Sequence, residues 1–172
     1  SSCGVAHRQV EEIMTASYFG ENNEVVIRTS ALTGKSLVVV STTSKGVKTL
    51  DDVQVISYEE LQKGETAYII ERVFGKDWRV SAQSFFQASP QGSELLVRTL
   101  NGIIAENAAT TASMLDLYAG VGIFAGTIGE GRFVTSVEQS ISASQDAIHN
   151  LGSNTNHVCS RVEDWDITPH YF

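Results

Sequence analysis

The pattern of hydrophobic and polar positions divides the chain near residue 90. Before that point, short segments rich in Val and Ile alternate with turn residues, a pattern typical of β-strands. Gly34 lies between the first two segments, where a short hairpin connection needs a glycine. Residues 6–19 space Val10, Ile13 and Met14 along one face and predict a helix. Strands are expected over residues 24–29, 35–42, 53–57, 67–73 and 78–82.

After residue 90 the pattern changes to alternating strands and helices. Ser89 followed by Pro90 is a favourable helix start, because Ser caps the first turn and Pro fits the first helical position. The alternation predicts a parallel, Rossmann-like sheet with right-handed crossovers, so the fold class is α/β with a β-rich α+β region in front. Strands are expected over residues 113–119, 133–137 and 158–162, and helices over residues 90–107, 122–128 and 141–151.

The composition fits a folded protein without a membrane span. The chain has 172 residues and is 42% hydrophobic, which supports a buried core and excludes the disordered classes. No uncharged apolar stretch reaches the roughly 18 residues of a transmembrane helix, and residues 1–8 lack the order of a secretory signal. Cys3 and Cys159 form no disulfide framework, so a reducing cytoplasm is the expected location.

The charge limits what the chain can bind by itself. Its net charge is −8, from 12 Lys and Arg against 20 Asp and Glu. A free-standing nucleic-acid-binding protein usually carries a basic face, and this chain has no such excess. Either nucleic acid is not a partner, or the basic contacts lie outside these residues.

The candidate binding chemistry lies in residues 115–124, where a hydrophobic strand runs into a glycine-containing turn. Gly120 and Gly122 let a ligand approach the backbone closely, at the carboxyl end of a strand where α/β sheets bind ligands. The dinucleotide pattern GxGxxG is absent, because the third glycine comes late and the bulky Ile123 and Phe124 occupy the pyrophosphate position. That the chain is an NAD-dependent oxidoreductase is therefore a weaker hypothesis.

Acidic residues lie at or near the ends of the three predicted strands of the second half. Asp116 repels a pyrophosphate but accepts from an ammonium- or sulfonium-bearing ligand. Glu138 ends the second strand, where a carboxylate can accept hydrogen bonds from both hydroxyls of a ribose. Asp164 is placed to accept a hydrogen bond from the adenine amino group. Taken by itself, Asp164 is almost as well explained as a solvent-exposed acidic residue in a loop. Together the three acids favour S-adenosylmethionine over NAD.

Two motifs make the second half resemble the S-adenosylmethionine-dependent RNA (uracil-5-)-methyltransferases, which form 5-methyluridine in tRNA and rRNA. FFQASP, residues 85–90, is similar to the family's FxQ-x-N segment, and DLYAGVGIF, residues 116–124, is similar to its DLYCGxGTF. Tyr118 replaces the first glycine of the general methyltransferase motif, as it does in the family. The resemblance implies a partial Rossmann-like cofactor-binding methyltransferase domain over residues 85–172, and the β-rich central domain of the family over residues 1–84.

The resemblance implies a role for several side chains. Gln87 would contact ligands at the cofactor–substrate junction, and Tyr118 would lie against the cofactor. Glu138 would hold the ribose hydroxyls and Asp164 would lie by the adenine. Asp116, Gly120 and Gly122 complete the predicted cofactor-binding set.

Other positions qualify this assignment. Ile123 stands where the family has Asn or Thr, so one polar cofactor contact is lost or left to the backbone. Without the resemblance, Gln87 is equally well explained as a surface residue, and Phe85 and Phe86 are expected first as core aromatics. Cys3 resembles the last cysteine of the iron–sulfur set of some members, but the other three would precede residue 1, so no complete iron–sulfur site and no metal site is expected.

The reaction of this family needs residues that the chain is not expected to contain. A cysteine adds to uracil C6, and a base removes the C5 proton after methyl transfer. In the family both follow the third strand of the domain, so the chain is expected to be truncated and Cys159 is not nominated. The prediction is the cofactor-binding half of a methyltransferase for uridine C5, with weak cofactor binding and no turnover alone. The alternative is a non-catalytic cofactor- or nucleotide-binding module.

The expected truncation bears on partners. RNA, as tRNA or rRNA, is expected to bind through the parent protein. Without a neighbouring fourth strand, residues 113–119 would form an open, hydrophobic sheet edge, and such edges recruit partners. Self-association as a homo-oligomer along that strand is therefore expected.

Overall fold

The computed structural model describes residues 7–21, 23–87, 89–107 and 113–166, and the chain divides into two compact units. The first unit is Ser1–Ile70 and the second is Glu71–Phe172. The division falls inside strand β4 (Tyr68–Val73), which runs from one unit into the other. The family-based boundary after residue 84 stays a prediction.

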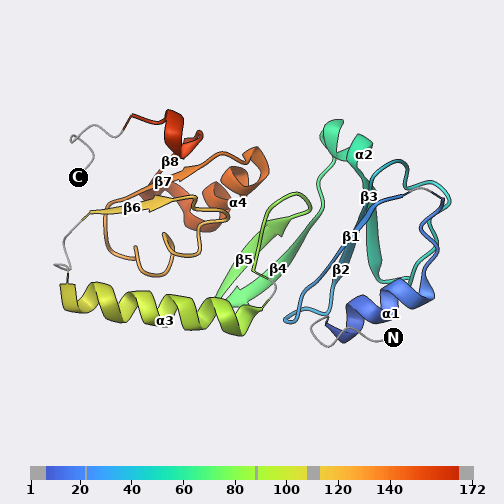
Figure 1. Ribbon diagram of the computed structural model, residues 1–172, viewed down its shortest axis with the longest axis horizontal. Helices are drawn as coiled ribbons and strands as arrows, with labels where there is room; N and C mark the ends of the chain where they lie inside the picture. The colour runs from blue at the N-terminus through green and yellow to red at the C-terminus, as the bar shows by residue number, and fades with distance from the viewer. Residues whose placement is uncertain (1–6, 22, 88, 108–112, 167–172) are drawn as a thin grey trace. The chain divides into compact units, whose positions relative to one another are not determined.

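The first unit is a three-stranded sheet with two helices (Figure 1). The strand order is β1-β2-β3, with β1 and β2 antiparallel and β2 and β3 parallel. The predicted hairpin between the first two strands is therefore confirmed. The elements are α1 (Arg8–Ala16), β1 (Val25–Thr29), β2 (Ser36–Val40), β3 (Val53–Ser57) and α2 (Tyr58–Gln62).

The core of the first unit lies between α1 and the central strand β2. All five residues of β2 are buried, which explains its continuous Val-rich sequence. Ile13 of α1 packs with Val38 and Val40 of β2, and partly buried residues such as Phe19 surround them. The predicted apolar face of α1 is confirmed for Ile13, which is buried against the sheet, but not for Met14, which is 61% exposed.

The second unit begins with a two-stranded hairpin of β4 and β5 (Lys76–Ser81). Phe74 and Gly75 both have positive φ, 54° and 73°, as the tight two-residue turns of hairpins require. Trp78 of β5 is fully buried, and its indole nitrogen donates a hydrogen bond of 3.1 Å to the Val73 carbonyl. The hairpin therefore carries a large apolar anchor of its own.

A parallel sheet completes the second unit, with strand order β6-β7-β8 (Figure 1). The first four residues of the central strand β7 are buried and its last, Glu138, is partly exposed. This arrangement confirms the predicted α/β fold with parallel strands. The elements are α3 (Pro90–Asn107), β6 (Met114–Leu117), β7 (Val134–Glu138), α4 (Ile141–Leu151), β8 (Thr155–Cys159) and the short 3-10 helices η1 (Gly152–Asn154) and η2 (Val162–Asp164).

Two predicted elements of this half are wrong. The third strand spans Thr155–Cys159 rather than residues 158–162, because the chain turns directly after Gly152 and enters the sheet early. Residues 122–128 form hydrogen-bonded turns instead of a helix. Bonds of the helical kind join Gly126 N to Gly122 O and Ile128 N to Phe124 O, but regular helix does not form. Glycine at these positions lowers helix propensity.

Strand β6 lies at the edge of the described sheet, with β7 as its one neighbour there. Leu115 and Leu117 of β6 are partly buried. The open edge agrees with the sequence-based expectation for this strand, and self-association along it stays a prediction. Within the described part of the chain, no helix is long and apolar enough to cross a membrane.

Candidate functional site

The turn after β6 wraps around the carboxylate at the end of β7. Tyr118, Gly120 and Gly122 all have positive φ, at 57°, 56° and 90°. Left-handed residues at alternate positions turn the backbone sharply and can aim its N–H groups inward. The amide of Gly120 donates a hydrogen bond of 2.8 Å to Oε2 of Glu138. The predicted glycine turn and the predicted ribose-binding acid are therefore neighbours.

The two glycines of the turn have different surroundings. A Cβ added to Gly120 would find no heavy atom within 4 Å, so the backbone there borders open space. A Cβ on Gly122 would lie 2.7 Å from Cδ1 of Leu151 on α4. Gly120 thus leaves room for a ligand, while Gly122 allows the turn to pack closely against the helix.

Glu138 is held in place by two backbone amides. Besides the bond from Gly120, its Oε1 accepts a hydrogen bond of 2.7 Å from Ser140 N. The carboxylate is partly exposed at the carboxyl end of β7. Each carboxylate oxygen can accept a second bond, so hydroxyl donors of a ligand can be added without breaking these contacts.

Asp116 lies beneath the turn rather than on its open side. Its residue is 6% exposed, and its Oδ2 accepts a hydrogen bond of 3.0 Å from Ala125 N. The pKa of Asp116 is raised to about 6, chiefly by burial; the bond from Ala125 opposes this rise, and the nearby charge of Glu138 adds to it. Asp116 therefore braces the turn from below, and direct contact with a ligand stays a prediction.

Tyr118 extends from the turn toward the segment after β8. The residue is 64% exposed, and its hydroxyl donates a hydrogen bond of 2.9 Å to Oε1 of Glu163. This bond and the charge of Glu163 raise the pKa of Tyr118. The sequence predicted a ligand contact for the adjacent Asp164 instead. Its side chain is 66% exposed, and its carboxylate lies 3.8 Å from Arg161 Nε. The two acids are neighbours in sequence, so the pattern alone could not tell which one reaches the turn.

A small pocket brings the two sequence motifs together. Its volume is about 120 Å³, and Gln87 and Phe86 from one motif line it with Tyr118, Gly120 and other residues of 118–124 from the other. Closed small-molecule sites usually measure roughly 300–1,000 Å³, so a ligand would extend over the open rim. Gln87 is exposed and lines this pocket, and its contact with a ligand stays a prediction.

The expectation of a core position is wrong for Phe85, which is 71% exposed. The buried residue of this segment is the preceding Ser84, whose hydroxyl bonds to Asp146 at 2.6 Å. Because Ser84 faces inward, the next side chain faces solvent at the rim of the pocket. Phe86 is partly buried and lines the pocket.

Comparison with known proteins places these features in context. No protein-family model matches the sequence. An uncharacterized RNA methyltransferase of Streptomyces avermitilis is 34% identical over 92 residues, which are 51% of this chain and 21% of that protein. One of Thermosynechococcus vestitus is 33% identical over 106 residues, 57% of this chain and 22% of that protein. Over about half of its length, the chain is therefore similar to these two RNA methyltransferases.

A solved structure supports the same relationship at the level of the fold. The tRNA (uracil-54, C5)-methyltransferase of Pyrococcus abyssi, solved with S-adenosyl-L-homocysteine, matches with a TM-score of 0.65 and 17% identity. The match covers 92% of this chain and 46% of that protein. The Rossmann-like methyltransferase fold inferred from the sequence is therefore confirmed. The aligned segments span about a fifth of the curated relatives, at 21% and 22% of their length.

In this chain, the predicted site residues converge only in part. Gln87, Tyr118, Gly120 and Glu138 border one pocket or the turn that lines it, whereas Asp164 points to Arg161. Among the described side chains, no group of three or more His, Cys, Asp or Glu could hold a metal ion. Cys3, with its resemblance to an iron–sulfur ligand, lies outside the described residues. Sequence reasoning missed Glu163, and also Asp146 and Asn150 of α4, described below.

Proposed function

We propose that this chain is the cofactor-binding half of an S-adenosylmethionine-dependent RNA methyltransferase. The observation that carries the proposal is the bond of 2.8 Å between Gly120 N and the Glu138 carboxylate, beside open space at the carboxyl end of β7. Ligands of open α/β sheets bind at this end of the strands. A fixed carboxylate with free lone pairs is suited to the paired hydroxyls of a ribose.

The residues around Glu138 fit the rest of an adenosine ligand. The exposed ring of Tyr118 offers a flat apolar face on one side of the pocket. Gln87 offers an amide that both donates and accepts. Ile123 and Phe124 line the pocket where a second phosphate-bearing half would need polar contacts, which disfavours NAD. When bound, S-adenosylmethionine supplies a methyl group on a sulfonium centre.

The proposed substrate is the C5 position of a uridine in tRNA or rRNA. Three observations support this: the FFQASP and DLYAGVGIF motifs, the RNA methyltransferase relatives, and the fold shared with a tRNA (uracil-54, C5)-methyltransferase. A uridine within folded RNA would have to leave its stack to reach the pocket. No described residue is assigned as nucleophile or base, and we propose that both, with most RNA contacts, belong to other parts of the parent protein.

Calorimetry with S-adenosylhomocysteine, S-adenosylmethionine and NAD tests the cofactor assignment on the 172-residue chain. We expect weak binding of the first two and none of NAD. Replacing Glu138 by Ala should weaken S-adenosylhomocysteine binding by about 1–3 kcal/mol, since a charged hydrogen-bond acceptor is lost. Glu130→Ala, in the exposed turn before β7, is the matched control. Binding of NAD in preference to S-adenosylhomocysteine, or equal affinity in both variants, would remove the proposed site.

The substrate is tested on the parent protein with RNA labelled with tritium at uridine C5. Methylation at C5 replaces that hydrogen, so turnover releases tritium into water in step with methyl incorporation. Methyl incorporation without tritium release would place the methyl group elsewhere on the RNA. Cofactor binding with neither signal would favour the non-catalytic module.

A further inference from the structure

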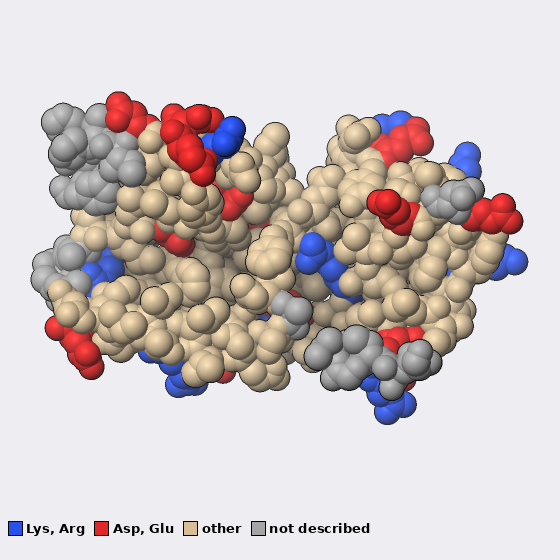
Figure 2. Space-filling view, viewed as in Figure 1, with Lys and Arg blue, Asp and Glu red and all other residues tan. Residues whose placement is uncertain are grey.

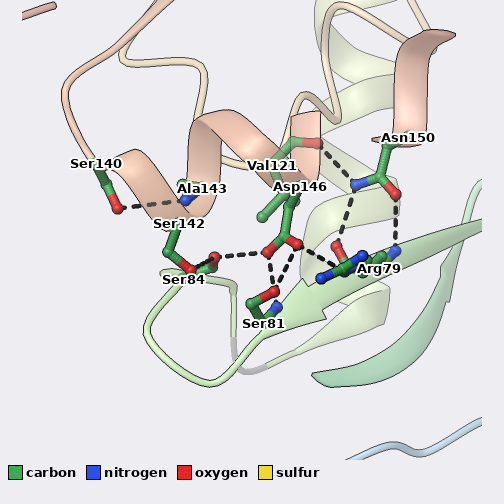
Figure 3. A network of polar contacts seen from close by, with 9 residues as sticks. All are labelled: Arg79, Ser81, Ser84, Val121, Ser140, Ser142, Ala143, Asp146 and Asn150. Atoms are coloured by element: carbon green, nitrogen blue, oxygen red, sulfur yellow. Dashed lines mark hydrogen bonds and ion pairs between the residues drawn. The ribbon is translucent and has the colours of Figure 1, made fainter. Parts of the chain in front are cut away.

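A buried polar network joins α4 to strand β5 and to the segment that follows it (Figure 3). Asp146 of α4 is fully buried. Its carboxylate accepts hydrogen bonds from Ser81 N and Ser81 Oγ, both at 2.7 Å, and from Ser84 Oγ at 2.6 Å. It also pairs with Arg79 Nε at 3.1 Å. Asp146 therefore fixes the chain immediately before Phe85, where the FFQASP motif begins.

Asn150 lies one helical turn further along α4 and uses every part of its amide. Its Oδ1 accepts from Arg79 N at 2.8 Å, and its Nδ2 donates to Arg79 O at 3.1 Å. The same Nδ2 donates to Val121 O at 3.0 Å. Val121 stands between Gly120 and Gly122, so Asn150 holds the middle of the glycine turn (Figure 3).

Two side chains of one helix thus hold the two walls of the pocket. Asp146 holds the wall that carries Gln87, through Ser84. Asn150 holds the wall that carries Gly120, through Val121. Burying a carboxylate and an amide is costly unless every group is bonded, and apolar residues would pack a helix against a hairpin more cheaply. Apolar packing could hold α4 against the hairpin, but it would not place a hydrogen bond at each wall of the pocket.

We propose that Asp146 and Asn150 are positioning residues, which set the separation of the Gln87 segment from the glycine turn and thereby the affinity for the adenosine ligand. Neither side chain lines the pocket, so both act through the backbone that they hold. The inference rests on the proposed function of the pocket. It adds that the pocket's dimensions are set from α4, none of whose residues is among those that line the pocket.

The test compares two amide-to-acid changes on the same helix. Asn150→Asp keeps the shape and the acceptor but removes the donor to Val121 and Arg79. Gln145→Glu makes the same chemical change at an exposed position of α4 and adds the same charge. S-adenosylhomocysteine affinity is measured by calorimetry at a low temperature at which both variants are folded. We expect about tenfold weaker binding for Asn150→Asp, the effect of roughly one hydrogen bond, because of the two lost bonds only the one to Val121 reaches the glycine turn, and no change for Gln145→Glu.

A purely stabilising role predicts a different result. It would lower the melting temperature of Asn150→Asp and leave the affinity at low temperature unchanged, and that result would overturn the proposal. Hydrogen exchange adds a readout that needs no ligand. We expect faster exchange of the amides of residues 119–125 in Asn150→Asp, with the amides of β7 still protected.

The two proposals can fail separately. If the unaltered chain binds no S-adenosylhomocysteine, the proposed function is wrong, and hydrogen exchange alone decides whether Asn150 holds the turn. Unchanged exchange over residues 119–125 would then refute the positioning role as well. If Asn150→Asp does not fold, Ser84→Ala takes its place, because it removes one hydroxyl bonded to Asp146. We expect a several-fold loss of affinity from that variant, and an unchanged affinity would refute the proposal.

Discussion

At the scale of single residues, the turn after β6 depends on a buried acid and on two glycines. Asp116 accepts the amide of Ala125 from a position that is only 6% exposed. Gly120 and Gly122 adopt φ values of 56° and 90°, which other residues adopt at a cost. Both features lead to predictions about the free energy of unfolding that require no bound ligand.

The first prediction concerns pH. Unfolded Asp has a pKa near 3.9, and burial raises that of Asp116 to about 6. The folded state therefore binds this proton more tightly than the unfolded chain does. Its contribution to the free energy of unfolding is fully present below about pH 4 and is lost as the pH rises to about 6, by about 2–3 kcal/mol in total.

Asp116→Asn isolates this contribution, because the amide is neutral at every pH and can still accept from Ala125 N. Urea unfolding, followed by circular dichroism at several pH values, gives both free energies. We expect the variant to gain about 2 kcal/mol on the unaltered protein between pH 4 and pH 7. Parallel curves across this range would show that Asp116 titrates normally.

The second prediction compares Gly120→Ala with Gly122→Ala. Both substitutions place a Cβ at positive φ, which costs about 1–2 kcal/mol. Gly122→Ala must also push Leu151 away from a separation of 2.7 Å, whereas a Cβ on Gly120 meets nothing within 4 Å. We expect Gly122→Ala to lower the free energy of unfolding by about 1–3 kcal/mol more than Gly120→Ala. Equal losses in urea unfolding would contradict the described packing of the turn on α4.

At the scale of elements, the sequence patterns predicted the buried strands, but they misplaced or missed elements rich in polar residues. Strand β2 is fully buried and rich in Val, and strand β7, whose first four residues are buried, carries Val134 and Val137; both strands were predicted. Strand β8 was displaced by three residues because its sequence, TNHVC, is largely polar, which the far edge of the sheet tolerates. Helix α2 was not predicted, although Ser57 and Glu60 have the sequence spacing of a capping box and form one in the structure.

The candidate site shows the same division. The glycine turn and Glu138 follow from local strand-to-turn patterns, so the sequence located them. Asp146 and Asn150 could not be found in this way, since their partners lie 62 to 71 positions away, apart from Val121. Only the packing of α4 on β5 brings those groups together.

The edge strand gives the prediction that belongs to this scale. In the described sheet β6 has one neighbour, and an unpaired, apolar edge favours association. We expect the chain to self-associate with rising concentration, and Leu115→Lys to shift it toward monomer, because an edge lysine opposes strand pairing. Sedimentation equilibrium measures the association. Leu95→Lys, on an exposed position of α3, controls for the loss of one apolar residue.

If the unaltered chain stays monomeric at high concentration, or if both lysine variants dissociate it equally, the edge of β6 is not the contact. A fall in the melting temperature of Leu115→Lys alone would not explain the result, since sedimentation is measured where the variant is folded. The experiment therefore separates an edge contact from a general effect of exposed leucines.

At the scale of the whole molecule, charge separates the two partners proposed for the parent protein. The net charge of −8 does not oppose a zwitterionic nucleoside, which binds through local contacts, but it opposes a polyanion. On each unit taken by itself, Lys and Arg side chains are scattered over the face that Figure 2 shows rather than gathered into one basic patch. Cofactor binding should therefore be a property of this chain, and strong RNA binding should not.

The last prediction tests that separation with a uridine-containing tRNA transcript. Filter binding at physiological salt should give a dissociation constant weaker than about 100 µM, the weak limit of ordinary non-specific binding. Because few phosphates would be neutralised, the logarithm of affinity should change little with the logarithm of salt concentration. The longer parent protein, measured in parallel, should bind more tightly and with a steeper salt dependence. Tight, strongly salt-dependent binding by this chain would mean that the RNA contacts lie within these 172 residues, contrary to the proposal.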